Sequence, residues 1–207
     1  YIHGGLCHSQ NIESIFGHTP GLKVALPSTA ADAKGLLATA IRSEDPVLFL
    51  EHKALYRAAS ARTPTPPEDY TLPFGKARIA REGSDMTIVT YGMMTQKSLN
   101  VAEELEQEGV DVEVVDLRTI VPLDSETILE SVRKTNRALV VYEDHEFIGF
   151  GAELSAQIAD DAFTYLDAPI RRVAGEFTPI PFAHSLERSV LPSDEGILEA
   201  ARDLAAF

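Results

Sequence analysis

The stretch that decides the fold is HSQNIESIFGHTPGLKVALPS, residues 8–28. It opens with a polar triplet that contains a histidine, continues with apolar residues three and four positions apart, and then reaches a Thr-Pro-Gly turn and a short apolar run. This order predicts a loop, a helix, a turn and a buried strand. Ser9 is the expected helix cap, which places His8 just outside a helix N-terminus, where free backbone N–H groups and a partial positive charge favour anions.

The residues that follow continue with a helix and a second strand. Ser28 or Thr29 is the expected cap of a helix over residues 30–42, with Asp32 in its first turn, where the helix dipole favours a carboxylate. Residues 47–51 are almost all apolar, as in a strand that is buried on both faces of a parallel sheet. Strand, helix and strand in this order predict a parallel α/β layer.

A proline-rich stretch at residues 61–73 divides the chain. Prolines at this density favour an extended path without secondary structure, so we interpret the stretch as a linker between domains at residues 1–60 and 74–207. The second domain begins with alternating apolar and charged residues, which is typical of an edge strand. Further strands are expected at residues 86–91, 112–117, 138–143 and 170–174, and helices at residues 96–108, 125–134, 149–161 and 197–206. This repeated alternation predicts a second parallel sheet.

The net charge, the hydropathy and the cysteine content argue against several classes of function. The formal net charge is −14, which argues against nucleic acid and against an anionic membrane surface, because both attract basic proteins. The same charge is compatible with docking onto a basic protein. No apolar run approaches the roughly 20 residues that cross a bilayer, and the single Cys7 excludes an internal disulfide. The chain begins at Tyr1 and not at a methionine, which favours a fragment or a processed product.

Three motifs near the start of the chain carry a family resemblance. They are His-Ser-Gln, then His-x-Pro-Gly-Leu-Lys-Val, then Pro-Ser-Thr-x-x-Asp-Ala-Lys-Gly-Leu-Leu. Together they resemble the beta subunit of the thiamine-diphosphate-dependent 2-oxo acid dehydrogenases, the decarboxylating components of the pyruvate and branched-chain 2-oxo acid dehydrogenase complexes. Asp-Leu-Arg-Thr at residues 116–119 and Pro-Leu-Asp at residues 122–124 match a domain that this family shares with transketolases.

The resemblance covers nearly the whole chain and implies a two-domain α/β fold. Residues 1–60 would be the C-terminal half of a domain that binds the pyrimidine ring of thiamine diphosphate. Residues 74–207 would form a doubly wound domain like the C-terminal domain of transketolases, which does not bind the cofactor directly. The N-terminal part of the beta subunit, with the carboxylate that activates the cofactor, would be missing from this chain.

His8 is the catalytic residue that the resemblance implies. In the family, the histidine of His-Ser-Gln lies beside the cofactor and is assigned to proton transfer or to handling of the acyl intermediate. From the residues alone, the simpler interpretation is that His8 only satisfies loop carbonyls. The resemblance places the cofactor's phosphates and Mg²⁺ on the alpha subunit, so no other residue of this chain is expected to hold the cofactor.

A potassium site is the second implied feature. In relatives, carbonyls and an acidic or amide side chain in the turn after the first long helix hold the ion, and Ala40, Ile41, Ser43 and Asp45 stand at those positions. Hard oxygen ligands at a helix C-terminus suit such a cation. Ser43 replaces the aspartate that relatives often have, and an ordinary solvated turn is an equally good interpretation of these residues.

Several charged residues are candidates for interfaces. Arg118 follows a strand, and its permanent charge suits a carboxylate of the other domain or a substrate anion. Glu51, His52 and Lys53 follow another strand, where open parallel sheets place their ligand crevice, although a surface ion-pair cluster is the simpler interpretation. The carboxylate of Phe207 at the C-terminus is a candidate contact for a basic partner domain.

The activity implied is oxidative decarboxylation of a 2-oxo acid, with transfer of the acyl group to a lipoyl domain. A branched-chain 2-oxo acid is the favoured substrate, with pyruvate as the other. The implied partners are an alpha subunit, in a tetramer of two alpha and two beta chains, and the lipoyl-bearing acyltransferase. This chain alone is expected to be inactive. The implied location is the bacterial cytoplasm or the mitochondrial matrix.

Two other functions compete with this interpretation. The first is a non-catalytic fragment that serves dimerisation and docking to the acyltransferase core. The second is another transketolase-like enzyme, such as a deoxyxylulose phosphate synthase. Those enzymes carry the alpha and beta parts on one chain and lack His-Ser-Gln followed by Pro-Gly-Leu-Lys-Val, so they rank lower.

Overall fold

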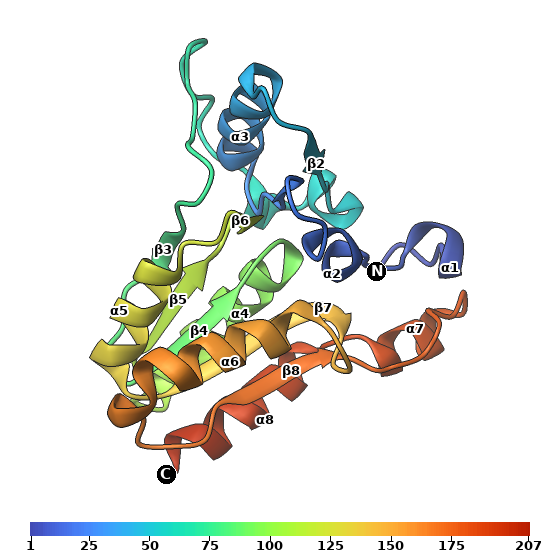
Figure 1. The fold of residues 1–207 in the computed structure, drawn as a ribbon. Coiled ribbons are helices and arrows are strands. Elements are labelled where there is room, and N and C mark those ends of the chain that lie inside the picture. The colour runs from blue at the N-terminus through green and yellow to red at the C-terminus, as the bar shows by residue number, and fades with distance from the viewer.

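The computed structural model describes residues 1–207 and places the strands in two sheets (Figure 1). The strands are β1 (Lys23–Ala25), β2 (Val47–Phe49), β3 (Arg78–Arg81), β4 (Met86–Thr90), β5 (Val112–Asp116), β6 (Thr119–Val121), β7 (Ala138–His145) and β8 (Arg171–Gly175). The helices are α1 (Gly5–His8), α2 (Glu13–Gly17), α3 (Ala30–Arg42), α4 (Met93–Gln107), α5 (Ser125–Thr135), α6 (Phe150–Ala162), α7 (His184–Val190) and α8 (Asp194–Ala205), with short 3-10 turns η1 (Lys53–Arg57), η2 (Ala59–Ala61) and η3 (Phe163–Tyr165). None of the helices is long and apolar enough to span a membrane.

The smaller sheet has the order β2-β1-β6. β1 and β2 pair in parallel and are joined through α3, as the strand-helix-strand pattern predicted. α3 is capped by Thr29, whose hydroxyl accepts a hydrogen bond from the Asp32 N–H at 3.2 Å. β2 is half-buried and not buried on both faces, because it lies at the edge of the sheet.

The beginning of the chain differs from the predicted loop and helix. Ser9 does not cap α2, which begins at Glu13 with Ile12 in the cap position and no side-chain cap. Ser9 instead ends α1: its N–H donates to the Gly5 carbonyl at 3.0 Å, and its hydroxyl accepts from the Gly4 N–H at 2.9 Å. The serine hydroxyl is thus already engaged in the preceding turn, so the second helix starts four residues later.

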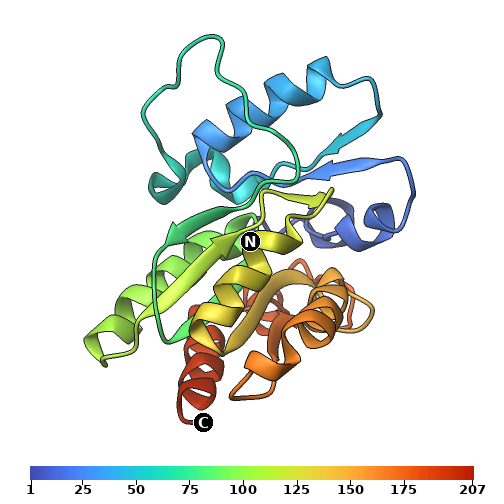
Figure 2. The ribbon, with the colours of Figure 1, turned by 60° about the vertical axis from the view of Figure 1, so that its left-hand side comes forward.

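The proline-rich segment lies beside α3 (Figure 2). Its backbone carbonyls accept hydrogen bonds from the helix side chains. The Lys34 ammonium donates to the carbonyls of Pro66 and Pro67, both at 2.7 Å, and the Thr39 hydroxyl donates to the Leu72 carbonyl at 2.7 Å. These contacts fix the path of a segment that has no regular hydrogen-bonded structure of its own.

The larger sheet has the order β3-β5-β4-β7-β8 and is covered by helices on both faces. Alternate residues of a strand point to opposite faces. Ile88 of β4 belongs to the core under α4 and α8, and its neighbour Val89 belongs to the core under α5 and α6. The sheet is therefore doubly wound, as the family resemblance implied, with β3 at its edge as the alternating pattern predicted.

Both sheets contain an antiparallel pair that the sequence did not predict. β3 runs antiparallel to β5, and β6 runs antiparallel to β1. β6 follows β5 of the larger sheet after two residues, so the two sheets are joined through consecutive strands. The fold is the expected α/β type with mixed sheets, and the β5-to-β6 connection holds the carboxyl ends of both sheets next to each other.

Candidate active site

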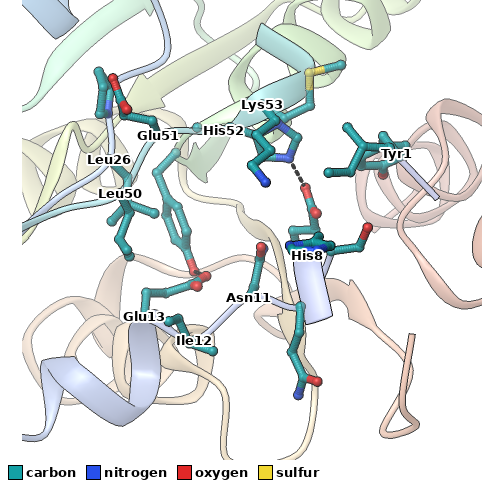
Figure 3. Close-up of a pocket in the computed structure, with 18 residues that line it drawn as sticks. Tyr1, His8, Asn11, Ile12, Glu13, Leu26, Leu50, Glu51, His52 and Lys53 are labelled. Atoms are coloured by element: carbon teal, nitrogen blue, oxygen red, sulfur yellow. Dashed lines mark hydrogen bonds and ion pairs between the residues drawn. The ribbon is translucent and has the colours of Figure 1, made fainter. Parts of the chain in front are cut away.

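A pocket of about 180 Å³ opens where the carboxyl ends of the strands in both sheets meet the start of the chain (Figure 3). It is lined by Tyr1 and Ile2, residues 8–13, Leu26 and Pro27 after β1, residues 50–53 after β2, residues 91–93 after β4, and Glu143 near the end of β7. Open α/β sheets place their ligands at the carboxyl ends of the strands. The pocket is therefore the candidate active site.

His8 lines this pocket, although its surroundings differ from the prediction. It is the last residue of the four-residue helix α1 and does not lie outside a helix N-terminus. His8 therefore lacks the anion-favouring helix N-terminus that the sequence predicted directly after it. The side chain is exposed and has no hydrogen-bond partner within the chain, so it is available to a ligand.

A buried carboxyl forms another part of the pocket wall. Glu13 is 1% exposed, and its Oε1 accepts a hydrogen bond from the Tyr91 hydroxyl at 2.9 Å. Burial, followed by the negative charge of Asp144, raises the pKa of Glu13 to about 8. Burial also raises the pKa of Tyr91 well above its ordinary value. Both groups are therefore uncharged at pH 7, and the sequence analysis did not identify either of them.

A histidine–carboxylate pair crosses the pocket between the two sheets. His52 Nε2 lies 2.8 Å from Oε2 of Glu143, and both side chains are largely buried (Figure 3). The pair joins the end of β2 to the end of β7, across 91 residues of sequence. His52, which the sequence suggested as an interface residue, thus pairs with Glu143, a partner that the spacing of residues in the sequence could not identify.

We expect His52→Ala to lower the free energy of unfolding by about 2 kcal/mol, because Glu143 would remain buried without its hydrogen-bond partner. Urea unfolding followed by circular dichroism measures the effect. Lys53→Ala is the matched control, since Lys53 is an exposed neighbour and its loss should change the stability by less than about 0.5 kcal/mol. Equal stabilities of the two variants would contradict this role of the pair.

Arg118 forms an ion pair between the sheets and does not line the pocket. Its Nε lies 2.9 Å from Oδ1 of Asp32, in the first turn of α3, and the Asp32 side chain is 3% exposed. Arg78 lies 3.8 Å from the same aspartate and 3.0 Å from Asp116. Burial raises the pKa of Asp116, against the lowering effect of the Arg78 charge. The arginine thus meets a carboxylate of the other domain, which is one of the two roles considered for it.

The residues of the implied potassium site already interact with a lysine. The Lys23 ammonium lies 3.1 Å from the Ser43 hydroxyl and 2.9 Å from Oδ2 of Asp45. The Ala40 carbonyl accepts a hydrogen bond from the Ser43 N–H at 3.1 Å, and Ile41 is exposed. A potassium ion at these oxygens would have to share them with a positive charge, so these residues alone do not fit the ion, and the site stays a prediction.

Two further observations bear on metals and partners. The chain contains no group of three or more His, Cys, Asp or Glu side chains placed to hold a metal ion. Phe207 is 61% exposed and follows α8, at the far end of the larger sheet from α1 and α2 (Figure 1). The expected contact of its carboxylate with a basic partner therefore concerns a surface remote from the pocket.

Comparison with known proteins decides the family. Residues 75–197 match the transketolase C-terminal domain, and residues 2–59 match the transketolase pyrimidine binding domain. The chain belongs to the transketolase family. The pocket with His8 thus lies where the two matched regions of this transketolase-family chain meet.

Several curated relatives share nearly half of the residues of this transketolase-family chain. The 2-oxoisovalerate dehydrogenase subunit beta of Bacillus subtilis is 46% identical over 207 residues, which is 100% of this chain and 63% of the relative. The pyruvate dehydrogenase E1 component subunit beta is 48% identical in Bacillus subtilis and 47% identical in Staphylococcus aureus, over 100% of this chain and 62% of each relative. The chain thus spans less than two thirds of the length of these relatives.

Solved structures agree with the transketolase fold. A split-gene transketolase described as an inactive beta4 tetramer has a TM-score of 0.75 and 24% identity, over 93% of this chain and 60% of that chain. A transketolase mutant from Pichia stipitis has a TM-score of 0.63 and 17% identity, over 98% of this chain and 28% of that chain. The expected fold is confirmed by these similarities.

Proposed function

We propose that this chain is the C-terminal part of the beta subunit of a thiamine-diphosphate-dependent 2-oxo acid dehydrogenase. In this proposal it takes part in oxidative decarboxylation of a 2-oxo acid and in transfer of the acyl group to a lipoyl domain. The observation that carries the proposal is the identity of 46% and 48% to beta subunits of two such enzymes over the whole chain. The His8 pocket between the two matched domains supports it.

The chemistry of the pocket wall fits one end of thiamine diphosphate. Ile12, Leu26 and Leu50 offer apolar contacts to a flat heterocycle, and the uncharged Glu13 adds no net charge beside it. When bound, the cofactor supplies an electron sink for loss of carbon dioxide. In this proposal the exposed imidazole of His8 accepts or donates a proton at a ring nitrogen.

The diphosphate and its Mg²⁺ are proposed to be held by another chain. Mg²⁺ bound to phosphates needs carboxylate or amide oxygens from a protein. We therefore propose an alpha subunit as the partner that completes the site, in a tetramer of two alpha and two beta chains. The lipoyl-bearing acyltransferase is the proposed partner for acyl transfer.

The substrate is proposed to be a branched-chain 2-oxo acid or pyruvate, with the branched-chain class favoured. The relatives include both kinds of enzyme at nearly equal identity, so the distinction requires an assay. The test is to purify this chain together with its alpha subunit and to measure decarboxylation of 2-oxoisovalerate and of pyruvate with thiamine diphosphate and Mg²⁺. We expect cofactor-dependent turnover of at least one substrate. A complex with an alpha subunit that binds the cofactor but turns over neither acid would contradict the proposed activity.

A further inference from the structure

Helix α2 is attached to the larger sheet through the side chains of its first two residues. Glu13 bonds with the Tyr91 hydroxyl at the end of β4. Ser14 donates a hydrogen bond to Asp144 on β7 and accepts one from the Phe150 N–H of α6 at 2.8 Å. Because α2 has only five residues and no side-chain cap, these contacts and not the helix itself determine where it lies.

The position of α2 determines one wall of the pocket. Ile12 and Glu13 line the pocket directly, and residues 8–11, which include His8, precede them without a break (Figure 3). A shift of α2 away from the sheet would move the segment that carries His8. The contact between Glu13 and Tyr91 therefore influences the position of His8 in the pocket. Glu13 itself has no proposed role in the chemistry.

Burial and the nearby Asp144 carboxylate favour the protonated form of Glu13 at this contact, although the Tyr91 hydroxyl could also donate to the charged form. Both oxygens of Asp144 accept hydrogen bonds, from the Ser14 hydroxyl and from the His145 N–H at 2.8 Å, and the charge of Asp144 raises the pKa of the nearby Glu13. Two charged carboxylates at one buried position are strongly unfavourable. We propose that Glu13 is a positioning residue that fixes the His8 segment against the larger sheet as an uncharged acid, and that loss of its proton loosens this attachment.

Burial and the carboxylates around Glu13 raise its pKa, while the hydrogen bonds from the Tyr91 hydroxyl and from its own backbone N–H lower it by less. Tyr91 faces it from β4, and Asp144 and Glu143 face it from β7, while the neighbouring residue of α6, Phe150, is apolar. Burial is the largest cause of the raised pKa of Glu13, and the two carboxylates raise it further, from an ordinary 4.5 to about 8. No positive charge among these groups offsets the cost of ionising Glu13.

The sign of the pH effect follows from this difference in pKa. A detached α2 has Glu13 in water with its ordinary pKa, so detachment releases a proton at pH values between 4.5 and about 8. The equilibrium constant for detachment should therefore increase roughly tenfold for each pH unit in this window. Above pH 8 both states are charged, so the constant should become independent of pH. The attachment is strongest at low pH and is weakened as pH rises.

Hydrogen exchange on the full chain tests this proposal without cofactor or partner. The exchange of residues 13–18 is measured between pH 5.5 and 9.5 in the parent protein and in Glu13→Gln, whose amide keeps the shape of the protonated acid. We expect the ratio of the two opening constants, parent to variant, to rise roughly tenfold per pH unit up to about pH 8 and then to level off. A ratio that does not change with pH would overturn the proposal.

Tyr91→Phe provides a second variant if Glu13→Gln does not fold. It removes the hydroxyl but keeps the ionisable carboxyl, so exchange should increase at every pH while its pH dependence remains. Identical exchange in Tyr91→Phe and the parent protein would show that the contact does not hold α2, and would also overturn the proposal. Because the measurement needs no catalysis, its failure is distinct from failure of the proposed dehydrogenase activity.

Discussion

Replacing Arg118 with methionine is expected to lower the free energy of unfolding by about 3 kcal/mol. The substitution leaves the Asp32 carboxylate, which is 3% exposed, without its closest positive partner. Removing one member of a buried ion pair typically costs about 3 to 5 kcal/mol, because the other charge stays buried. We expect a cost at the lower end of this range, because the Arg78 guanidinium remains 3.8 Å from Asp32 and still compensates part of its charge. Urea unfolding at pH 7, with the midpoint and slope analysed together, gives the value.

A double variant separates the charge from the packing. Arg118→Met combined with Asp32→Asn removes both charges and should recover more than half of the lost stability, because no unpaired carboxylate remains buried. If the double variant is less stable than Arg118→Met by the full effect of Asp32→Asn alone, the two residues do not interact. That additive result would contradict the role of the pair in holding α3 against the larger sheet.

Replacing His8 with alanine is expected to lower acyl transfer to a lipoyl domain by about 100-fold in the complete complex. A positioned acid or base typically contributes about 10² to 10⁴ in rate, and the lower value fits a side chain that is exposed within the chain. Assembly should be unchanged, because His8 has no hydrogen-bond partner here. The measurement is the rate of lipoyl-domain acylation with a 2-oxo acid substrate.

A second histidine close in sequence provides the control for this variant. His18 is exposed in the turn after α2 and does not line the pocket, so His18→Ala should leave the transfer rate unchanged. An equal reduction in both variants would point to a general effect on folding. A normal rate in His8→Ala would remove the catalytic role proposed for His8.

Local features of the fold could be predicted from the sequence. Thr29 and Asp32 are three residues apart, so the helix cap depends only on the nearby chain, and the structure has it as expected. The alternation of apolar and charged residues before β4 likewise depends only on nearby residues, and it correctly indicated the edge strand β3. Ser9 shows the limit of this approach, because the preceding helix α1 ends at this residue and the Gly4 N–H already donates to the hydroxyl that a cap of α2 would use.

Contacts between distant residues could not be predicted in the same way. The sequence suggested a carboxylate of the other domain as the partner of Arg118 but gave no means of selecting Asp32, which lies in α3, 86 residues earlier in the chain. Glu13 and Tyr91 are 78 residues apart, and their raised pKa values depend on burial that neither sequence position reveals. The pairing of β6 with β1 likewise depends on the path of the chain between two sheets. The residues that form this wall of the pocket could therefore be identified only from the structure.

Native mass spectrometry of the protein with its companion chains, thiamine diphosphate and Mg²⁺ tests the central claim most directly. The account predicts a complex that contains alpha and beta chains and retains the cofactor. It also predicts that this chain alone does not retain the cofactor, because the alpha subunit is proposed to hold the diphosphate and Mg²⁺. A lone chain or homodimer without cofactor, in the presence of an alpha subunit, would contradict the account and would favour a non-catalytic assembly module.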